Sequence, residues 1–299
     1  ATSTSLLQKK NINKMNKNEI NFAFFGTPSV ASRTLDILLE SGYTPKVIVT
    51  SPDARSGRGM HMTETEVGQW ATEHGIPCLK PEKVNQDFIK EFSKYRVDVS
   101  IVVAYGKILP QVLIDIPLRG TINIHYSLLP LYRGASPVEE ALIKGDTKTG
   151  VSIQQMAFKL DSGAILAEQI VPIAVDDMKE ELRSRLIDIG GQMLSNILPD
   201  VVEGKLIPKA QDESKATFCT KIKKEDGEID IAGNASENYN KYRAFEGWPG
   251  VYFFVEKNDR KIRVKIKKAV YENNSFIIER VVPEGKKEMD YDVFLNTLK

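Results

Sequence analysis

The first two thirds of the chain alternate short apolar runs with segments of helical period. Residues 20–25 and 46–50 read as buried strands, and 29–39 between them has helical spacing. Residues 97–105 are apolar on both faces, which is typical of a central parallel strand covered by helices on each side. This rhythm predicts an α/β protein with an open, Rossmann-like, mostly parallel sheet, whose ligands bind at the carboxyl ends of the strands.

The same reasoning predicts the remaining elements of this region. Further strands are expected at 77–79, 121–126, 151–156 and 167–173, and helices at 64–74, 85–95, 137–144 and 178–203.

Pattern and composition change near residue 204. Residues 205–222 carry no helical or strand period and are expected to be a linker, so the catalytic unit is expected to cover 19–204. The last segment, 223–299, has short strand-like runs separated by turn signals, which predict a small OB-like β-barrel. Those runs are 250–255, 261–267, 269–271 and 275–279.

Composition places the chain among folded proteins. Of its 299 residues, 41% are hydrophobic and 27% charged, which excludes a disordered or collagen-like chain. Residues 1–18 are polar with four lysines and no acid, and are expected to be a disordered tail. We expect a cytoplasmic protein. An organellar transit peptide is the less favoured alternative, because the tail lacks arginine.

Membrane and metal roles are not expected. No apolar run is long enough to cross a bilayer. The two cysteines, Cys78 and Cys219, form no C-x-x-C pair, so no metal site is predicted. The formal net charge is +1, with basic ends around an acidic centre, a weak indication of a polyanionic partner.

Candidate chemistry lies in and after the strand at 121–126. The period of two places Asn123, His125 and Ser127 on one face, where an amide could stabilise an oxyanion and an imidazole could transfer a proton. The alternative is an edge strand with a solvated polar face. Asp161, in an Asp-Ser-Gly loop, could orient the imidazole, although such a triplet alone is typically a turn.

These motifs resemble the tetrahydrofolate-dependent formyltransferases. The resemblance rests on Asn123-x-His125-x-Ser127-Leu128-Leu129-Pro130, on Arg133-Gly134 and on Asp161-x-Gly163, and extends from about residue 20 to 287. It implies a catalytic trio of Asn123, His125 and Asp161, with the first base left open between His125 and Asp161. It also implies 10-formyltetrahydrofolate as the formyl-donating co-substrate. The expected folate-binding residues are Val103, Ala104, Tyr105, Gly106, Ser127, Leu128, Leu129 and Pro130.

The segment 52–59 resembles the tRNA-contacting loop of the family members that formylate initiator methionyl-tRNA. Methionyl-tRNA is therefore the expected acceptor, with Arg55, Arg58 and Arg133 as tRNA-binding residues. Met60-His61-Met62 stands where the family usually has lysines, which puts the strength of tRNA binding in question. A monomer is expected.

The run 261–267 gives a second, independent argument for tRNA. It alternates cations with branched apolar residues, so one strand face would carry Lys261, Arg263, Lys265 and Lys267. Cations spaced by about 6.6 Å along a strand can follow a phosphate backbone. The alternative is an edge strand that lysines protect from aggregation.

Other function classes are weighed against these motifs. A formyltransferase acting on a nucleotide-linked amino sugar would share the trio and a small second domain, but the arginine loop and the basic strand argue against it. A non-catalytic RNA-binding module would not need the trio. A nucleotide-binding oxidoreductase is disfavoured, because neither G-x-G-x-x-G nor a Walker A motif follows any strand.

Overall fold

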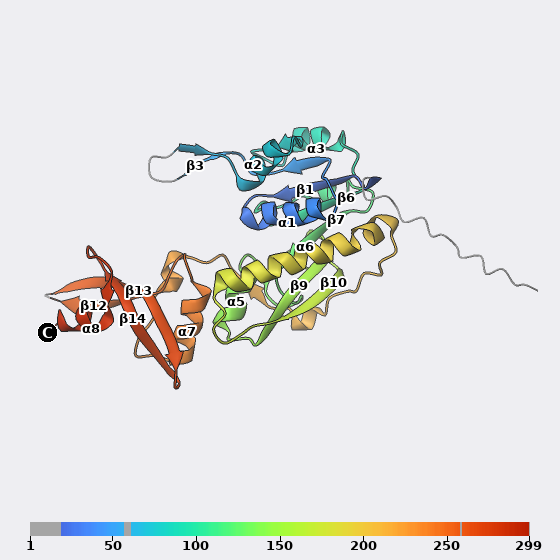
Figure 1. The fold of residues 1–299 in the computed structure, drawn as a ribbon. Coiled ribbons are helices and arrows are strands. Elements are labelled where there is room, and N and C mark those ends of the chain that lie inside the picture. The colour runs from blue at the N-terminus through green and yellow to red at the C-terminus, as the bar shows by residue number, and fades with distance from the viewer. Residues whose placement is uncertain (1–18, 57–60, 258, 299) are drawn as a thin grey trace, which may run out of the picture.

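The structure is a computed structural model that describes residues 19–56, 61–257 and 259–298 (Figure 1). The tail expected at 1–18 lies outside the described residues. Among those described, no helix is both long and apolar enough to span a membrane.

A seven-stranded sheet forms the centre of the larger unit, in the order β10-β9-β7-β6-β1-β2-β5. Neighbours are parallel from β5 to β7, whereas β9 is antiparallel to both β7 and β10. The sheet is thus mostly parallel, as predicted. Its strands are β1 (Phe22–Gly26), β2 (Val47–Val49), β5 (Cys78–Leu79), β6 (Val99–Val103), β7 (Thr121–His125), β9 (Lys148–Gln155) and β10 (Ile165–Pro172).

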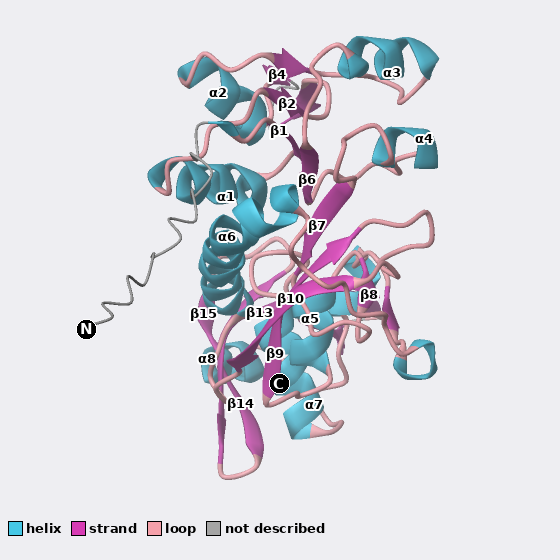
Figure 2. Cartoon of the chain, turned by 90° about the vertical axis from the view of Figure 1, so that its right-hand side faces the viewer, coloured by secondary structure: helices cyan, strands magenta, loops and turns pink. Residues whose placement is uncertain are grey.

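Helices cover both faces of this sheet (Figure 2). They are α1 (Ser29–Glu40), α2 (Glu66–Glu73), α3 (Gln86–Ser93), α4 (Gln111–Ile114), α5 (Pro137–Ile143) and α6 (Lys179–Glu203). Strand β1 shows why two layers form. Phe22 and Phe24 belong to the core cluster that includes buried residues of α1, α2 and α6, while Ala23 and Phe25 belong to a second cluster with α3 and α4. Burial of alternate side chains in opposite layers requires a strand that is apolar on both faces.

A short hairpin follows β2. It consists of β3 (Ala54–Ser56) and β4 (His61–Thr63), paired antiparallel, with Arg55 opposite Met62. The hairpin and the C-terminal sheet project on the same side of the molecule in Figure 1.

The segment expected to be a linker is attached to the larger unit. It contains a 3-10 turn, Glu213–Lys215, and strand β11 (Phe218–Cys219), which pairs in parallel with β8 (Arg133–Gly134). Sequence pattern did not predict this pairing, because two-residue strands carry no period.

The C-terminal unit is a four-stranded antiparallel sheet of order β12-β13-β14-β15. It comprises a 3-10 turn at Lys224–Gly227, α7 (Ala235–Ala244), β12 (Tyr252–Lys257), β13 (Arg260–Glu272), β14 (Ser275–Pro283), β15 (Met289–Asp290) and α8 (Tyr291–Asn296). The two runs expected at 261–267 and 269–271 are one strand, β13, with a register shift at Lys268 that interrupts the apolar alternation. Helices α7 and α8 were not predicted.

Buried cations join the two units. The Lys179 ammonium, at the start of α6, donates to the carbonyl oxygens of Glu246 and Trp248. The Arg243 guanidinium, on α7, donates to the carbonyls of Ala174 and Asp177, each at 3.2 Å. A single hydrophobic core cluster contains residues of both units. The units are therefore packed together and not merely tethered.

Candidate active site

A cavity of about 740 Å³ opens where β6 and β7 end. It lies at the carboxyl ends of the parallel strands, where open α/β sheets bind ligands. Its volume is in the range of small-molecule sites, and many of its walls are apolar, including Leu109, Ile124 and Met156.

Asn123, His125 and Asp161 all line this cavity. The structure thus brings together three side chains separated by up to 38 positions in the sequence. His125 Nδ1 lies 3.7 Å from Asp161 Oδ2, and both side chains are largely buried. The alternative of a solvated polar strand edge does not hold for His125, since β7 lies between β6 and β9.

The hydrogen bonds of the His125 ring determine its neutral tautomer. His125 Nε2 lies 2.9 Å from the carbonyl oxygen of Tyr132. Because a carbonyl only accepts, Nε2 must carry the proton of this bond, and the lone pair of the neutral ring is then on Nδ1. The nitrogen that can take up a proton therefore faces Asp161.

The Asp161 carboxylate is held at both oxygens. Gly134 N donates to Oδ2 at 2.9 Å, and Gln154 Nε2 donates to Oδ1 at 3.0 Å. The Asp161 backbone has a φ of 47°, in the left-handed region. Gly163 follows, and a Cβ there would lie 1.5 Å from the Gln155 carbonyl oxygen, which explains physically why glycine stands in the Asp-x-Gly motif.

The predicted folate-binding residues separate into two groups. Ala104, Tyr105 and Gly106 line the cavity, on a turn where Ala104 and Gly106 have positive φ. Val103 and residues 127–130 are not among its lining residues. Val103 is buried in the hydrophobic core, and Ser127 Oγ is turned back to the Leu131 carbonyl. Direct folate contact by this second group remains a prediction.

Tyr105 forms an uncharged part of the cavity wall. Its side chain is buried, packs edge-on against Phe25, and its pKa is raised to about 12 by desolvation. The phenol therefore stays protonated at neutral pH.

Arg133 does not lie where the tRNA prediction requires. Its side chain is fully buried, and the guanidinium donates to Gln211 Oε1 and to both carboxylate oxygens of Glu213. The expectation that Arg133 contacts tRNA is wrong, because Gln211 and Glu213, from a distant segment of the chain, cover its guanidinium. A charge pattern does not reveal which arginines are covered by distant segments.

The other predicted tRNA contacts lie on two surfaces. Arg55 is exposed on β3, whereas Arg58 falls outside the described residues. On β13, Lys261 and Lys267 are exposed and Arg263 and Lys265 are half-buried. The Lys261 ammonium lies 4.1 Å from the centre of the Phe254 ring, and the Arg263 guanidinium lies 5.5 Å from that of Tyr252. These rings hold the cations in place on one face.

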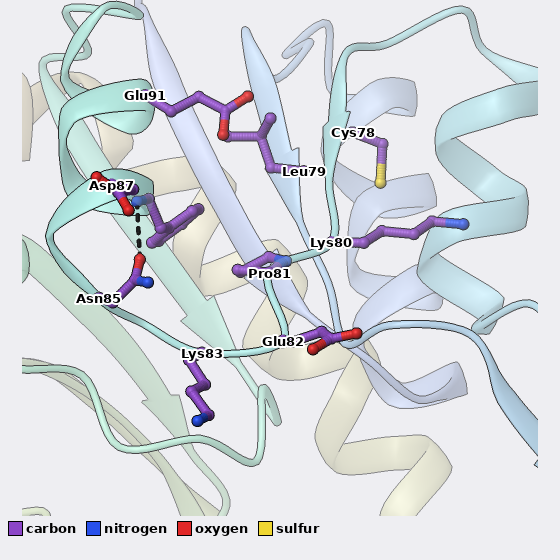
Figure 3. Close-up of a pocket in the computed structure, with 10 residues that line it drawn as sticks. Cys78, Leu79, Lys80, Pro81, Glu82, Lys83, Asn85, Asp87 and Glu91 are labelled. Carbon is purple, nitrogen blue, oxygen red and sulfur yellow. Dashed lines mark hydrogen bonds between the residues drawn. The ribbon is translucent and has the colours of Figure 1, made fainter.

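A second, polar cavity of about 580 Å³ lies between β5 and α3 (Figure 3). Lys80, one of its lining residues, donates to Asp53 at 2.8 Å and to Glu64 at 2.6 Å. These two carboxylates flank the β3–β4 hairpin, so Lys80 ties together the ends of the segment that carries Arg55. No motif or period in the sequence predicted this cavity.

Across residues 19–56, 61–257 and 259–298, no group of three or more His, Cys, Asp or Glu side chains could hold a metal ion.

Sequence reasoning also missed Gln154 and Gln211, which bond to the Asp161 loop. Glutamine has no charge or special backbone geometry by which a single sequence could single it out.

Family models and named proteins match most of this chain. The model of the family described as "Formyl transferase" matches residues 19–198, and that described as "Formyl transferase, C-terminal domain" matches 221–277. A protein of Sulfurihydrogenibium sp. named methionyl-tRNA formyltransferase is 38% identical over 89% of this chain and 85% of its own. One of the same name from Geobacter sulfurreducens is 40% identical over 80% and 76%.

Solved structures share the fold at lower identity. An N-formyltransferase from Helicobacter canadensis, in complex with folinic acid and dTDP-3-aminofucose, has a TM-score of 0.62 at 15% identity over 85% of this chain and 89% of that one. Methionyl-tRNA formyltransferase from Clostridium thermocellum has a TM-score of 0.58 at 16% identity, over 91% and 99%. The fold is thus shared with both of these structures. The family models, together with these relatives, show that the chain belongs to the formyl transferase family.

Proposed function

We propose that this protein transfers the formyl group of 10-formyltetrahydrofolate to the amino group of initiator methionyl-tRNA. The observation that carries the chemistry is the meeting of Asn123, His125 and Asp161 in one cavity at the carboxyl ends of β6 and β7. The acceptor is supported by the relatives named methionyl-tRNA formyltransferase at 38% and 40% identity.

The reaction begins when the neutral amine of the aminoacyl ester attacks the formyl carbon. A new C–N bond forms, and the carbonyl oxygen becomes an oxyanion that the Asn123 amide stabilises. Such a donor typically contributes about 3–4 kcal/mol to the transition state.

His125 then moves the proton. Its unprotonated Nδ1 accepts the proton from the new ammonium and delivers it to the departing folate nitrogen as the old C–N bond breaks. Asp161 Oδ2, 3.7 Å away, stabilises the imidazolium that exists between these two steps. Since both Asp161 oxygens already accept hydrogen bonds, we assign proton uptake to His125 and charge stabilisation to Asp161.

The folate is proposed to occupy the cavity beside the turn of Ala104, Tyr105 and Gly106. The tRNA is proposed to contact Arg55 on the hairpin and the cations of β13, Lys261, Arg263, Lys265 and Lys267. These side chains are exposed or half-buried, unlike Arg133.

The assay supplies 10-formyltetrahydrofolate with methionyl-tRNA, and in parallel with a nucleotide-linked amino sugar. We expect transfer to the initiator methionyl-tRNA. His125→Ala and Asn123→Ala should each lower the rate at least about 100-fold, because each removes a group that acts on the reacting atoms.

Thermal unfolding of each variant shows that the fold is retained. A near-normal rate in either variant would contradict the roles assigned here. Transfer to the sugar alone would keep the trio and overturn the acceptor, whereas transfer to neither would favour a binding module.

A further inference from the structure

The side chain of Gln211 connects the linker to the loop that carries Asp161. Its amide nitrogen donates to the carbonyl oxygens of Asp161 at 2.8 Å and Gly163 at 2.7 Å. Its amide oxygen accepts from Arg133 Nε at 3.1 Å and Nη2 at 2.7 Å. One side chain thus bonds both Arg133 and the loop that carries Asp161.

Arg133 in turn is held by a second residue of the linker, Glu213. Glu213 accepts from the buried guanidinium and from Lys159, and its pKa is lowered to about 2 chiefly by the Arg133 hydrogen bonds. A fully buried guanidinium must keep such partners, since an unpaired buried charge is costly. The Arg133–Gln211 contact is therefore strongly constrained.

The linker also pairs with the chain segment that orients the catalytic side chains. Thr217 accepts from Tyr132 N at 2.8 Å through its hydroxyl and from Arg133 N at 2.9 Å through its carbonyl. The Tyr132 carbonyl bonds His125, and Gly134 N bonds Asp161. Gln211, Glu213 and Thr217 thus contact the supports of both side chains without themselves lining the cavity.

We propose that Gln211 is a positioning residue for formyl transfer: its amide N–H groups hold the Asp161 backbone so that the carboxylate stays opposite His125 Nδ1. This inference rests on the proposed function. It assigns to the linker a part in catalysis that requires no contact with either substrate. It also makes the linker a physical connection between the tRNA-binding unit and the Asp161 loop.

Gln211→Glu separates this role from a merely structural one. A glutamate keeps an oxygen acceptor for Arg133, so the linker should stay docked. It places a carboxylate without N–H groups against the carbonyls of Asp161 and Gly163, which should displace the loop. We expect kcat to fall by about 10- to 100-fold, the range in which small misplacements of reacting groups act. The KM values for folate and for tRNA should stay within about threefold of the native values.

Asp212→Asn is the matched control. Asp212 is the adjacent residue, and its side chain accepts from Ser214 in the 3-10 turn, a bond that asparagine can retain. It should transfer formyl at the native rate. Gln211→Met, which removes donor and acceptor together, should lower both kcat and the thermal midpoint.

The outcomes distinguish the inference from the function on which it rests. Absence of transfer by the native protein would overturn the proposed function itself. Native transfer with an unchanged kcat in Gln211→Glu would overturn the positioning role, as would a loss confined to the KM for tRNA.

Discussion

At Gly163 the loop of Asp161 passes so close to β9 that no side chain fits. A Cβ would lie 1.5 Å from the Gln155 carbonyl oxygen, and the obstacle is backbone, which cannot rotate away. Any larger residue must displace either β9 or the loop. The position of the Asp161 carboxylate is therefore set by main-chain packing as well as by hydrogen bonds.

Gly163→Ala should accordingly lower the rate of formyl transfer by at least about 10-fold, because it moves Asp161 relative to His125. The neighbouring variant Ser162→Ala serves as control and should be near native, because the half-buried Ser162 donates its hydroxyl to the Lys159 carbonyl and not to Asp161. Steady-state transfer rates and thermal midpoints of both variants test this. Equal rates in the two variants would show that the loop absorbs the added methyl group.

At the scale of elements, the position of β13 in its sheet distinguishes the two explanations of its cations, phosphate binding and protection of an edge. It pairs with β12 on one side and β14 on the other, so it is not the edge of its sheet. Protection of an edge against aggregation therefore does not explain its lysines. The remaining explanation is phosphate binding by a row of exposed and half-buried cations. Two of them, Lys261 and Arg263, lie over the rings of Phe254 and Tyr252.

Arg263→Gln and Lys265→Gln should each raise the KM for tRNA and reduce its salt slope by about one, while folate affinity stays native. Lys268→Gln removes the same charge from the same strand, but Lys268 is already paired with Glu279 at 2.7 Å, so its effect should be smaller. KM values measured over a salt series check this. Equal slopes in all three variants would argue against a phosphate-binding role for this face.

The elements that sequence pattern predicted well are those with a strong period. The strand at β6 and the helix at α6 were placed within a few residues, because burial on both faces or one long stripe is visible in the order of side chains. Strand β13 was divided in two because the irregularity at Lys268 breaks its alternation. Strand β11 was missed because tertiary pairing, and not local preference, makes it a strand.

The same distinction applies to the site. Asn123, His125 and Asp161 could be named because their motifs are local. The burial of Arg133 depends on Gln211 and Glu213, about 80 residues later, and is not visible in a charge pattern.

At the scale of the whole molecule, Asp177 lies at the junction of the two units. Its buried carboxylate accepts from both Nη atoms of Arg185 and from Ala174 N, while its carbonyl accepts from Arg243 on α7. The pKa of this carboxyl is lowered below its usual value, chiefly by the Arg185 hydrogen bonds. Ionised Asp177 therefore stabilises the folded state.

The lowered pKa of Asp177 determines how the stability of the folded state changes with pH. An unfolded aspartate has a pKa of about 3.9, so the stabilisation is fully present above that value and is lost as the pH falls through the lower folded pKa. Asp177→Asn should lower the thermal midpoint at pH 7 by at least about 3 °C. The difference from the native protein should shrink below about pH 4.

Asp176→Asn, at the exposed neighbouring position, is the control and should follow the native midpoint across the pH range. Thermal melts from about pH 3 to about pH 7 test this, because that interval includes the pH at which carboxyl groups titrate. A deficit in Asp177→Asn that stays constant with pH would mean that the charge of Asp177 does not contribute.

Because residues 211–219 are docked on the larger unit, a chimera of two related chains depends on where the parents are joined. A chimera joined at the end of α6 would pair one parent's Arg133 and Asp161 loop with another parent's Gln211, Glu213 and β11. A seam after Cys219 keeps all of these contacts within one parent. Recombination that exchanges the C-terminal unit should therefore be better tolerated after β11 than at the end of α6, so the segment that must come from one parent is longer than the Rossmann-like sheet.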